Sequence, residues 1–251
     1  IVSAEPDIEA QEQFWMLGSI PEPKTWFKGI RSLGAGQLAH ISKNFEVTID
    51  TWADIGKYRR QSDVLSNAMP HENTQIEVRR FIKESVRRHL VADVPVGLFL
   101  SGGIDSGALA GLMVDEIGAD KVTGITICFD EFEGDIADEA PVAQEIAQYY
   151  GIKHIIRKVT KAEFLSDLPA ILRAMDQPSI DGVNTWYACK AASEVGLKVV
   201  LSGVGGDELL LGYASFKSLP RLVDRYHLLL KFPFVYPIVN FVALLLAYGS
   251  K

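Results

Sequence analysis

Two segments of this chain combine glycine-rich turns with acidic residues, and each directly follows a short apolar run. Gly97–Leu100 leads into Ser101-Gly102-Gly103-Ile104-Asp105-Ser106, and Val199–Leu201 leads into Ser202–Glu208. Glycine lets backbone N–H groups approach a ligand because no Cβ stands in the way. N–H groups at the start of a helix favour phosphate, and the helix dipole adds to that preference. The two segments therefore predict a phosphate site, to which Ser101 and Ser106 would add hydroxyl donors.

Asp105 and Asp207, one in each segment, need a separate explanation because carboxylates repel phosphate. Mg²⁺ typically combines one or two carboxylates with substrate phosphates, so the pair predicts a metal clamp over a triphosphate. Each segment alone is equally compatible with a tight strand-to-helix turn that the aspartate caps, but two such segments in one sheet weaken that interpretation. The chain lacks a Walker P-loop and a GxGxxG fingerprint, which argues against kinase-type and dinucleotide sites.

The sequence around these segments alternates between short apolar runs and amphipathic stretches. We expect strands at Val96–Leu100, Val122–Phe129, Lys153–Val159 and Lys198–Leu201, and helices at Asp105–Ile117, Asp138–Tyr150, Thr160–Met175 and Thr185–Val195. This alternation is typical of an α/β fold, with a parallel sheet covered by helices on both faces. Ligands of such sheets bind beyond the carboxyl ends of the strands, where both glycine-rich segments lie.

Composition divides the chain into four parts. Residues 1–58 predict a short helix and a hairpin around Lys43-Asn44, and the polar residues 59–73 predict a linker. Residues 74–218 hold the alternating elements, and residues 219–251 begin a helical region. Thr74-Gln75-Ile76-Glu77 has the pattern of a capping box, which predicts a helix start.

Two further stretches allow both a purely structural and a functional interpretation. The basic residues after Glu77 are more typical of the solvated face of a helix than of a phosphate site. The apolar stretch Leu228–Gly249 contains Lys231, Pro233 and Pro237, so it predicts a buried helical hairpin and not a membrane span.

Charge and cysteine content restrict the function further. The 25 Lys and Arg against 32 Asp and Glu give a formal net charge of −7, which argues against nonspecific nucleic-acid binding but not against a nucleotide ligand. Two cysteines, Cys128 and Cys189, make neither a disulfide framework nor a zinc cluster, and they favour a reducing, cytoplasmic location. The start Ile1–Ala10 has no initiator Met and no signal-peptide pattern, so we expect a piece of a longer protein.

Four segments carry a family resemblance. SGGIDS at 101–106 resembles the pyrophosphate loop of ATP pyrophosphatases, and LSGVGGDELLLGY at 201–213 resembles the second signature of glutamine-hydrolysing asparagine synthetases. DQPSIDGVNT at 176–185 is similar to that family as well. PEPKTWFKGIRSLGAGQL at 21–38 resembles the junction that ends the family's N-terminal glutaminase domain. The first loop alone is shared by several enzyme classes, whereas the two signatures together are specific.

The resemblance implies an adenine nucleotide alpha hydrolase-like fold and an AMP-forming ligase. Aspartate and MgATP would give β-aspartyl-AMP and pyrophosphate, and ammonia would then displace AMP to give asparagine. Residues 1–58 would be the tail of a glutaminase domain, which supplies ammonia from glutamine in the parent chain. No nucleic-acid or membrane partner is implied, and a homodimer is left open.

The resemblance also assigns roles to individual residues. The expected pyrophosphate contacts are Ser101, Gly102, Gly103 and Ser106, and the expected magnesium ligands are Asp105 and Asp207. Phe99 and Ile127 would contact adenine and ribose, and Ser202 and Gly203 would make further ATP contacts. The expected catalytic residues are Asp105, Asp207 and Glu208.

The chain departs from the family pattern at several points. Val204 stands where well-studied members carry a glutamate, a proposed base for the ammonia step, and Leu210 and Leu211 replace Phe-Gly. Neither cysteine matches the N-terminal glutaminase nucleophile, so this chain is not expected to hydrolyse glutamine. A related amidotransferase that acts on another carboxylate and a non-catalytic ATP-binding domain are the alternatives.

A few other residues have the types that chemistry uses. His154 is predicted to be a satisfied surface histidine without a catalytic role. Asp176 and Asp181 fit a substrate contact and a turn cap equally well. Trp186 and Tyr187 are predicted to pack against the sheet, not to stack on a base.

Overall fold

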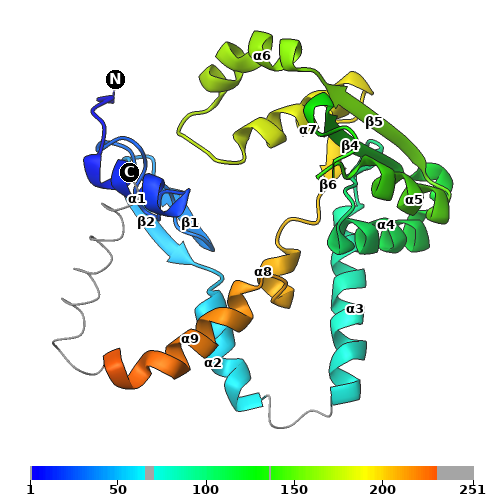
Figure 1. Cartoon of the computed structure of the whole chain (residues 1–251). Coiled ribbons are helices and arrows are strands. Elements are labelled where there is room, and N and C mark those ends of the chain that lie inside the picture. The colour runs from blue at the N-terminus through cyan, green and yellow to red at the C-terminus, as the bar shows by residue number, and fades with distance from the viewer. Residues whose placement is uncertain (1, 66–70, 136, 231–251) are drawn as a thin grey trace. The chain divides into compact units, whose positions relative to one another are not determined.

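The computed structural model describes residues 2–65, 71–135 and 137–230, and the chain divides into two compact units, Ile1–Ser202 and Gly203–Lys251 (Figure 1). The first unit contains an N-terminal segment and a parallel sheet with its helices. The second unit contains two described helices. None of the helices within these described ranges is both long and apolar enough to cross a membrane. The apolar stretch Leu228–Gly249, for which a buried helical hairpin is predicted, lies outside the described residues from Lys231 onward.

The N-terminal segment forms a helix and a hairpin, as the sequence predicts. Helix α1 spans Ile8–Leu17 and begins at Asp7, whose carboxylate accepts a hydrogen bond from the Ala10 N–H. Strands β1, Gln37–Ile41, and β2, Val47–Thr51, pair antiparallel. The predicted linker 59–73 is helical wherever it is described: α2 spans Ile55–Leu65 and α3 begins at His71. Its long polar side chains are good helix formers, which the polar composition alone does not reveal.

Helix α3, His71–His89, corrects the predicted capping box. Thr74 lies inside the helix, so it does not occupy the N-cap position that a capping box requires. Neither glycine nor proline separates His71 from Thr74, so nothing in the sequence stops the helix from starting earlier. The basic residues of this helix are exposed and form pairs with neighbouring acids: Arg80 with Glu77, and Arg87 and Arg88 with Glu84. This agrees with a solvated helix face.

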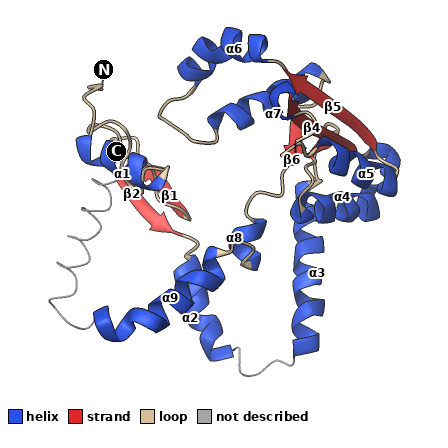
Figure 2. Cartoon of the chain, viewed as in Figure 1, coloured by secondary structure: helices blue, strands red, loops and turns tan. Residues whose placement is uncertain are grey.

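A four-stranded parallel sheet forms the centre of the first unit (Figure 2). The order of its strands is β5-β4-β3-β6. The strands are β3, Val96–Phe99; β4, Thr123–Phe129; β5, Lys153–Val159; and β6, Val199–Leu201. The connecting helices are α4, Ile104–Ile117; α5, Ala140–Tyr150; α6, Lys161–Ala174; and α7, Gly182–Glu194. Short 3₁₀ turns, η2 at Ala119–Lys121 and η3 at Asp130–Phe132, flank β4.

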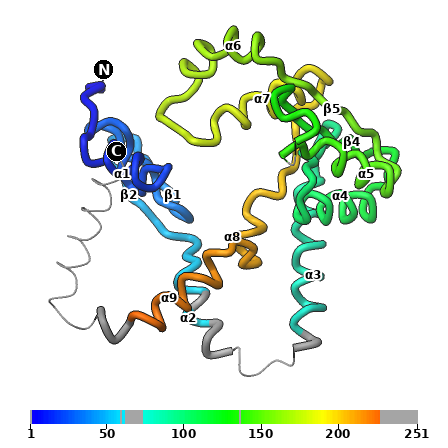
Figure 3. Tube along the Cα trace, viewed as in Figure 1, coloured from blue at the N-terminus to red at the C-terminus, as the bar shows by residue number. Residues whose placement is uncertain are grey.

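Helices cover both faces of this sheet, so the predicted fold class is confirmed. On one face, Leu98 and Leu100 pack with Ala110 and Met113 of α4 and with Ala147 of α5. The other face is covered by α7 and α6. There Ile125 packs with Ala191 and Ala192, and Val159 packs with Ile171 and Tyr187. Figure 3 follows the chain from β5 through α6 and α7 to β6.

Small residues let α4 lie close to α5. A Cβ added at Gly107 would lie 3.5 Å from Ile146 Cδ1, and one at Gly111 would lie 2.6 Å from the Tyr150 hydroxyl. Close approach of the two helices holds the start of α4 against the body of the unit. The helix that follows the first glycine-rich segment is therefore anchored along its length.

The second unit begins with α8, Gly206–Leu210, and continues with α9, Ser215–Leu230. Gly205 has φ of 98° and precedes α8, a conformation that a residue with a Cβ rarely adopts. The predicted boundary between residues 218 and 219 falls within α9.

Candidate functional site

The first glycine-rich segment, which we call the SGGIDS loop (residues 101–106), is closed by its two serines. The Ser101 N–H donates to Ser106 Oγ at 3.1 Å, and the two hydroxyl oxygens lie 2.8 Å apart. The Gly103 N–H donates to Ser101 Oγ at 3.1 Å. Ser106 is buried, and its Oγ also lies 3.1 Å from the carbonyl oxygens of Ser101 and Gly103. A hydroxyl has one proton to donate, so Ser106 serves first to hold the loop onto α4.

Four N–H groups of the SGGIDS loop have no acceptor among the described residues: those of Gly102, Ile104, Asp105 and Ser106. They belong to the loop and to the first turn of α4, whose N–H groups have no partner within the helix. Gly102 lies close to α5, since a Cβ there would lie 3.3 Å from Val142 Cβ. The free N–H groups and the helix dipole make this point suitable for an anion.

Asp105 follows directly in the first turn of α4 and is half-buried. Its carboxylate has no hydrogen bond or ion pair within the described part of the chain, and it caps no helix. Both oxygens are therefore available to a ligand. An unpaired carboxylate beside amides that favour anions fits a bound cation, because the cation offsets the charge repulsion.

The second glycine-rich segment leaves the sheet beside the first. Strands β3 and β6 are parallel neighbours, with Leu98 opposite Leu201. Ser101 and Ser202 therefore both follow the carboxyl ends of adjacent strands. The expectation that the two segments start at the same edge of one sheet is confirmed.

In the second unit, Asp207 and Glu208 lie in the first turn of α8. The Asp207 carboxylate is half-buried and has no hydrogen bond or ion pair with the described residues. It packs so closely on Gly212 that a Cβ there would collide with it. Glu208 accepts a hydrogen bond of 2.7 Å from the Tyr213 hydroxyl, which lowers the pKa of its carboxyl group. Val204 is 89% exposed.

Phe99 and Ile127 are both half-buried on the face of the sheet that α7 covers. They pack with Ile125, which lies opposite Phe99 in the β3–β4 register. This puts two apolar side chains close to the carboxyl edge of the sheet. Their contact with adenine or ribose stays a prediction, as do the ligand contacts of Ser202 and Gly203.

Two polar residues near the SGGIDS loop were not predicted to belong to the site. Thr126 is buried in β4 and lies 2.6 Å from the Leu100 carbonyl oxygen, directly before the loop. His154 Nε2 lies 2.7 Å from the Thr126 hydroxyl oxygen, and burial lowers the pKa of the imidazole. The hydrogen bond agrees with a satisfied histidine. The signal for Thr126 is a polar residue between two isoleucines, Ile125 and Ile127.

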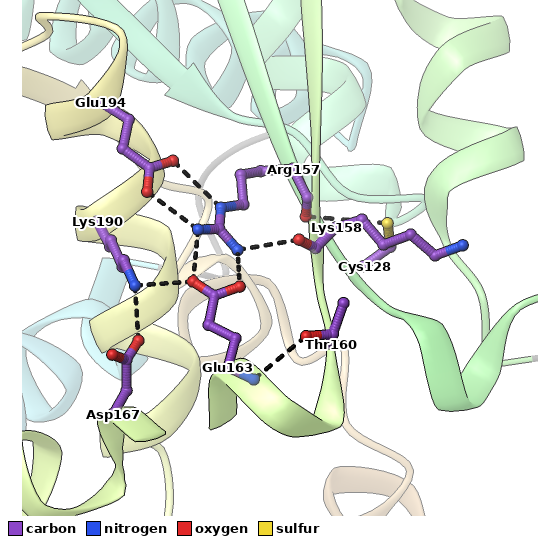
Figure 4. Close-up of polar contacts among 8 residues, drawn as sticks. All are labelled: Cys128, Arg157, Lys158, Thr160, Glu163, Asp167, Lys190 and Glu194. Atoms are coloured by element: carbon purple, nitrogen blue, oxygen red, sulfur yellow. Dashed lines mark hydrogen bonds and ion pairs between the residues drawn. The ribbon is translucent and has the colours of Figure 1, made fainter. Parts of the chain in front are cut away.

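An ion-pair network ties the edge strand β5 to α6 and α7 (Figure 4). Arg157 binds Glu163 through two hydrogen bonds of 2.5 and 2.6 Å, and it also binds Glu194. Lys190 binds Glu163 at 2.7 Å and Asp167 at 2.6 Å. Arg157 and then Lys190 lower the pKa of Glu163 to about 2.

Other polar residues make local hydrogen bonds at the starts of helices. Thr160 caps α6 as expected by accepting from the Glu163 N–H, but the Glu163 carboxylate binds Arg157 and does not complete a capping box. Asp138 accepts from the Ala140 N–H at the start of α5. Asp181 precedes α7 and accepts from the side chains of Asn184 and Thr185.

The aromatic residues of α7 lie where the sequence predicts them. Tyr187 is fully buried against Phe129 and Val159, and Trp186 packs beside it. Both residues belong to the core beneath the sheet.

Comparison with known proteins shows which family this chain is similar to. The family model described as asparagine synthase matches residues 77–244. A protein of Mycobacterium tuberculosis H37Rv, named as a glutamine-hydrolyzing asparagine synthetase, is 33% identical over 220 residues, which cover 85% of this chain and 32% of that protein. Asparagine synthetase (glutamine-hydrolyzing) 1 of Bacillus subtilis 168 is 30% identical over 218 residues, with the same coverage.

The chain is also similar, at lower identity, to proteins with other names. Amidase chyE of Penicillium rubens is 28% identical over 223 residues, which cover 83% of this chain and 32% of the amidase. Among solved structures, the NH3-dependent NAD synthetase of Campylobacter jejuni matches with 19% identity and a TM-score of 0.36, covering 55% of this chain and 60% of that one. The chain spans about a third of the length of the curated relatives that it matches. With two thirds of its residues in the family model, the chain belongs to the asparagine synthetase family.

Proposed function

We propose that this chain is the ATP-binding part of an AMP-forming amide ligase, in which MgATP activates a carboxylate and ammonia then replaces AMP. The observation that carries the proposal is the start of the two glycine-rich segments on adjacent parallel strands. The first segment has N–H groups and a carboxylate that bind no other described residue. Membership of the asparagine synthetase family supports an ATP-dependent amide ligase.

In this proposal the SGGIDS loop binds the pyrophosphate end of ATP. The N–H groups of Gly102, Ile104 and Asp105 donate to phosphate oxygens, and they neutralise charge that develops as pyrophosphate departs. Ser106 keeps these groups in place through its contacts with Ser101 and Gly103. Phe99 and Ile127 contact the nucleoside, and Ser202 and Gly203 contribute further polar contacts.

Asp105 and Asp207 are the proposed magnesium ligands. Neither carboxylate has a hydrogen bond or ion pair with the described residues, and carboxylates are the donor type that Mg²⁺ selects. The metal would withdraw charge from the phosphate oxygens during attack at the α-phosphorus. Glu208 is proposed as an acidic group of the same site, with its charge stabilised by Tyr213.

Aspartate is the first candidate for the activated carboxylate. Its β-carboxylate would attack the α-phosphorus, which forms β-aspartyl-AMP and releases pyrophosphate; ammonia would then attack the acyl carbon and release AMP. A glutaminase domain in the same parent protein is the proposed source of ammonia, with residues 1–58 as its tail. The assay is incubation of the parent protein with aspartate, MgATP and ammonium, followed by quantification of pyrophosphate, AMP and asparagine. Absence of both pyrophosphate and AMP would refute the ligase.

A second candidate is the same chemistry on a different carboxylate. Two points favour it: Val204 stands where the family signature that the chain resembles has a glutamate, and a relative is named an amidase. Release of AMP with other carboxylates, but not with aspartate, would select this candidate.

Substitution of the two aspartates tests the proposed metal site directly. Asp105→Asn and Asp207→Asn should each weaken MgATP binding at least ten-fold, since each removes a charged ligand, while binding of metal-free ATP should change much less. Isothermal titration with MgATP, and with ATP in the presence of EDTA, measures both affinities.

Asp115→Asn is the matched control, because it removes the same charge from the last turn of α4. It should bind MgATP like the unmodified chain. Unchanged MgATP affinity in both Asp105→Asn and Asp207→Asn would refute the metal clamp.

A further inference from the structure

Leu100 lies directly before the SGGIDS loop, and both its N–H and its carbonyl oxygen form hydrogen bonds with β4. Its N–H donates to the Ile125 carbonyl at 2.9 Å, and its carbonyl oxygen lies 2.6 Å from Thr126 Oγ. A carbonyl carries no proton, so the threonine hydroxyl is the donor. Strand β3 ends at Phe99, so this side-chain hydrogen bond replaces the ladder bond that a longer strand would provide.

The donor at Thr126 is itself fixed by His154. The threonine hydroxyl has a single proton, which it gives to Leu100, so at 2.7 Å it accepts from His154 Nε2. The imidazole therefore carries a proton on Nε2. Burial lowers the pKa of His154, which agrees with a neutral ring in this tautomer.

The strand register explains how a histidine on β5 reaches this threonine. His154 lies opposite Gly124, and Thr126 lies opposite Ile156, so the imidazole crosses diagonally on one face of the sheet. Gly124, which lies on the same face of β4 as Thr126, lets the side chains of Leu100 and Ile152 approach the strand. A Cβ there would lie 3.2 Å from Leu100 Cδ2 and 3.4 Å from Ile152 Cδ1.

We propose that His154 and Thr126 are positioning residues, which fix the Leu100 carbonyl and thereby the direction in which the SGGIDS loop leaves the sheet. The chain of hydrogen bonds runs from the His154 Nε2–H to the Thr126 hydroxyl and from there to Leu100. Ser101 is the next residue, so a shift of the Leu100 peptide moves the free N–H groups of the loop. Groups that bind a charged ligand lose effect when displaced by about 1 Å. The identity of the ligand rests on the proposed function, but the role in loop position does not.

Two variants of Thr126 separate the hydroxyl from the shape of the side chain. Thr126→Val keeps the branched shape but leaves the Leu100 carbonyl and His154 Nε2–H without their partner, whereas Thr126→Ser keeps the hydroxyl. Thr123→Val is the matched control, because it makes the same change at the first residue of β4, three residues before Thr126. In the ligand-free chain, amide hydrogen exchange of the segment 100–106 should be about ten-fold faster in Thr126→Val. It should be close to normal in Thr126→Ser and unchanged in Thr123→Val.

MgATP titration gives the second readout. Thr126→Val should bind MgATP about ten-fold more weakly, and Thr126→Ser should restore most of that affinity. Unchanged exchange in Thr126→Val would overturn the proposal. Altered exchange in a chain whose unmodified form does not bind MgATP would instead refute the proposed function and leave the positioning role intact.

The tautomer of His154 tests the same proposal without a substitution. The ¹⁵N chemical shifts of the imidazole should report a proton on Nε2 in the unmodified chain at neutral pH. A proton on Nδ1 alone would overturn the proposal, because Nε2 would then be unable to donate to Thr126.

Discussion

Leu211 has a backbone conformation that its residue type disfavours. Its φ of 60° lies in the left-handed region, which costs a residue with a Cβ roughly 1–2 kcal/mol relative to glycine. The family signature that the chain resembles has a glycine at this position. The side chain is 59% exposed, so it contributes little packing that would offset the strain.

Replacement of this leucine should therefore stabilise the chain. We expect Leu211→Gly to raise the free energy of unfolding by about 0.5–1 kcal/mol, since relief of strain exceeds the extra entropy that glycine loses on folding. Urea denaturation measures the change. Leu210→Gly, one residue earlier and within α8, should lower the free energy of unfolding instead. Destabilisation of similar size at both positions would contradict the strain at Leu211.

At the residue scale, the sequence predicts which residues belong to the site better than it predicts their hydrogen-bond partners. The glycines and Asp105 were identified because their types restrict the chemistry. Ser106 was expected to face a ligand, yet its nearest partners are Ser101 and Gly103. The role of Thr126 depends on His154, 28 residues away on another strand, and spacing along the chain does not reveal such a contact.

Helices and strands with local signals were predicted to within a few residues. Thr160 caps α6, and Gly151 ends α5 in the left-handed conformation, as the sequence indicates. The start of α3 was missed because a Thr-x-x-Glu pattern inside a continuous helix looks the same as a capping box at its end. Tertiary contacts decide between the two, and they are not encoded in so short a pattern.

The network around Arg157 shows how one strand holds two helices. Arg157 lies on β5, Glu163 on α6, and Lys190 and Glu194 on α7 (Figure 4). The Glu163 side chain is 23% exposed and is shared by both cations. The pKa of Glu163 falls from 4.5 to about 2, because the charged form gains Arg157 and Lys190 as partners.

This shift predicts a specific loss of stability in acid. A carboxyl group whose pKa is lower in the folded chain stabilises it above the unfolded pKa, so the contribution is complete above about pH 4.5 and is lost as pH falls to about 2. After solvent screening we expect about 1–2 kcal/mol at neutral pH. Glu163→Gln should remove this contribution and flatten the dependence of the free energy of unfolding on pH between 5 and 2. Urea denaturation at several pH values measures it.

Glu84→Gln is the matched control for this prediction. The pKa of Glu84 is also lowered to about 2, by Arg87 and then Arg88, but all three residues lie on a single helix and both arginines are exposed. Exposed pairs on one helix contribute little. A loss at Glu84 as large as the loss at Glu163 would contradict the role of the network in joining separate elements.

At the scale of the whole molecule, the proposed ligands come from two units. Asp105 and the SGGIDS loop belong to the first unit, and Asp207 and Glu208 belong to the second. The second segment leaves β6 at Ser202, where the first unit ends. The sequence predicted both segments from their composition, but it did not predict that the division between compact units falls inside one of them.

A bound MgATP should therefore reduce motion in both units at once. We expect saturating MgATP to slow amide hydrogen exchange in the segments 101–107 and 203–209, because in the proposed function each supplies a ligand to the same triphosphate and metal. ATP with EDTA should protect mainly 101–107, whose N–H groups bind phosphate without a metal. Hydrogen exchange read by mass spectrometry resolves the two segments. If MgATP protects 101–107 but not 203–209, Asp207 does not contact the bound nucleotide. That result would contradict the part of the proposed site that the second segment contributes.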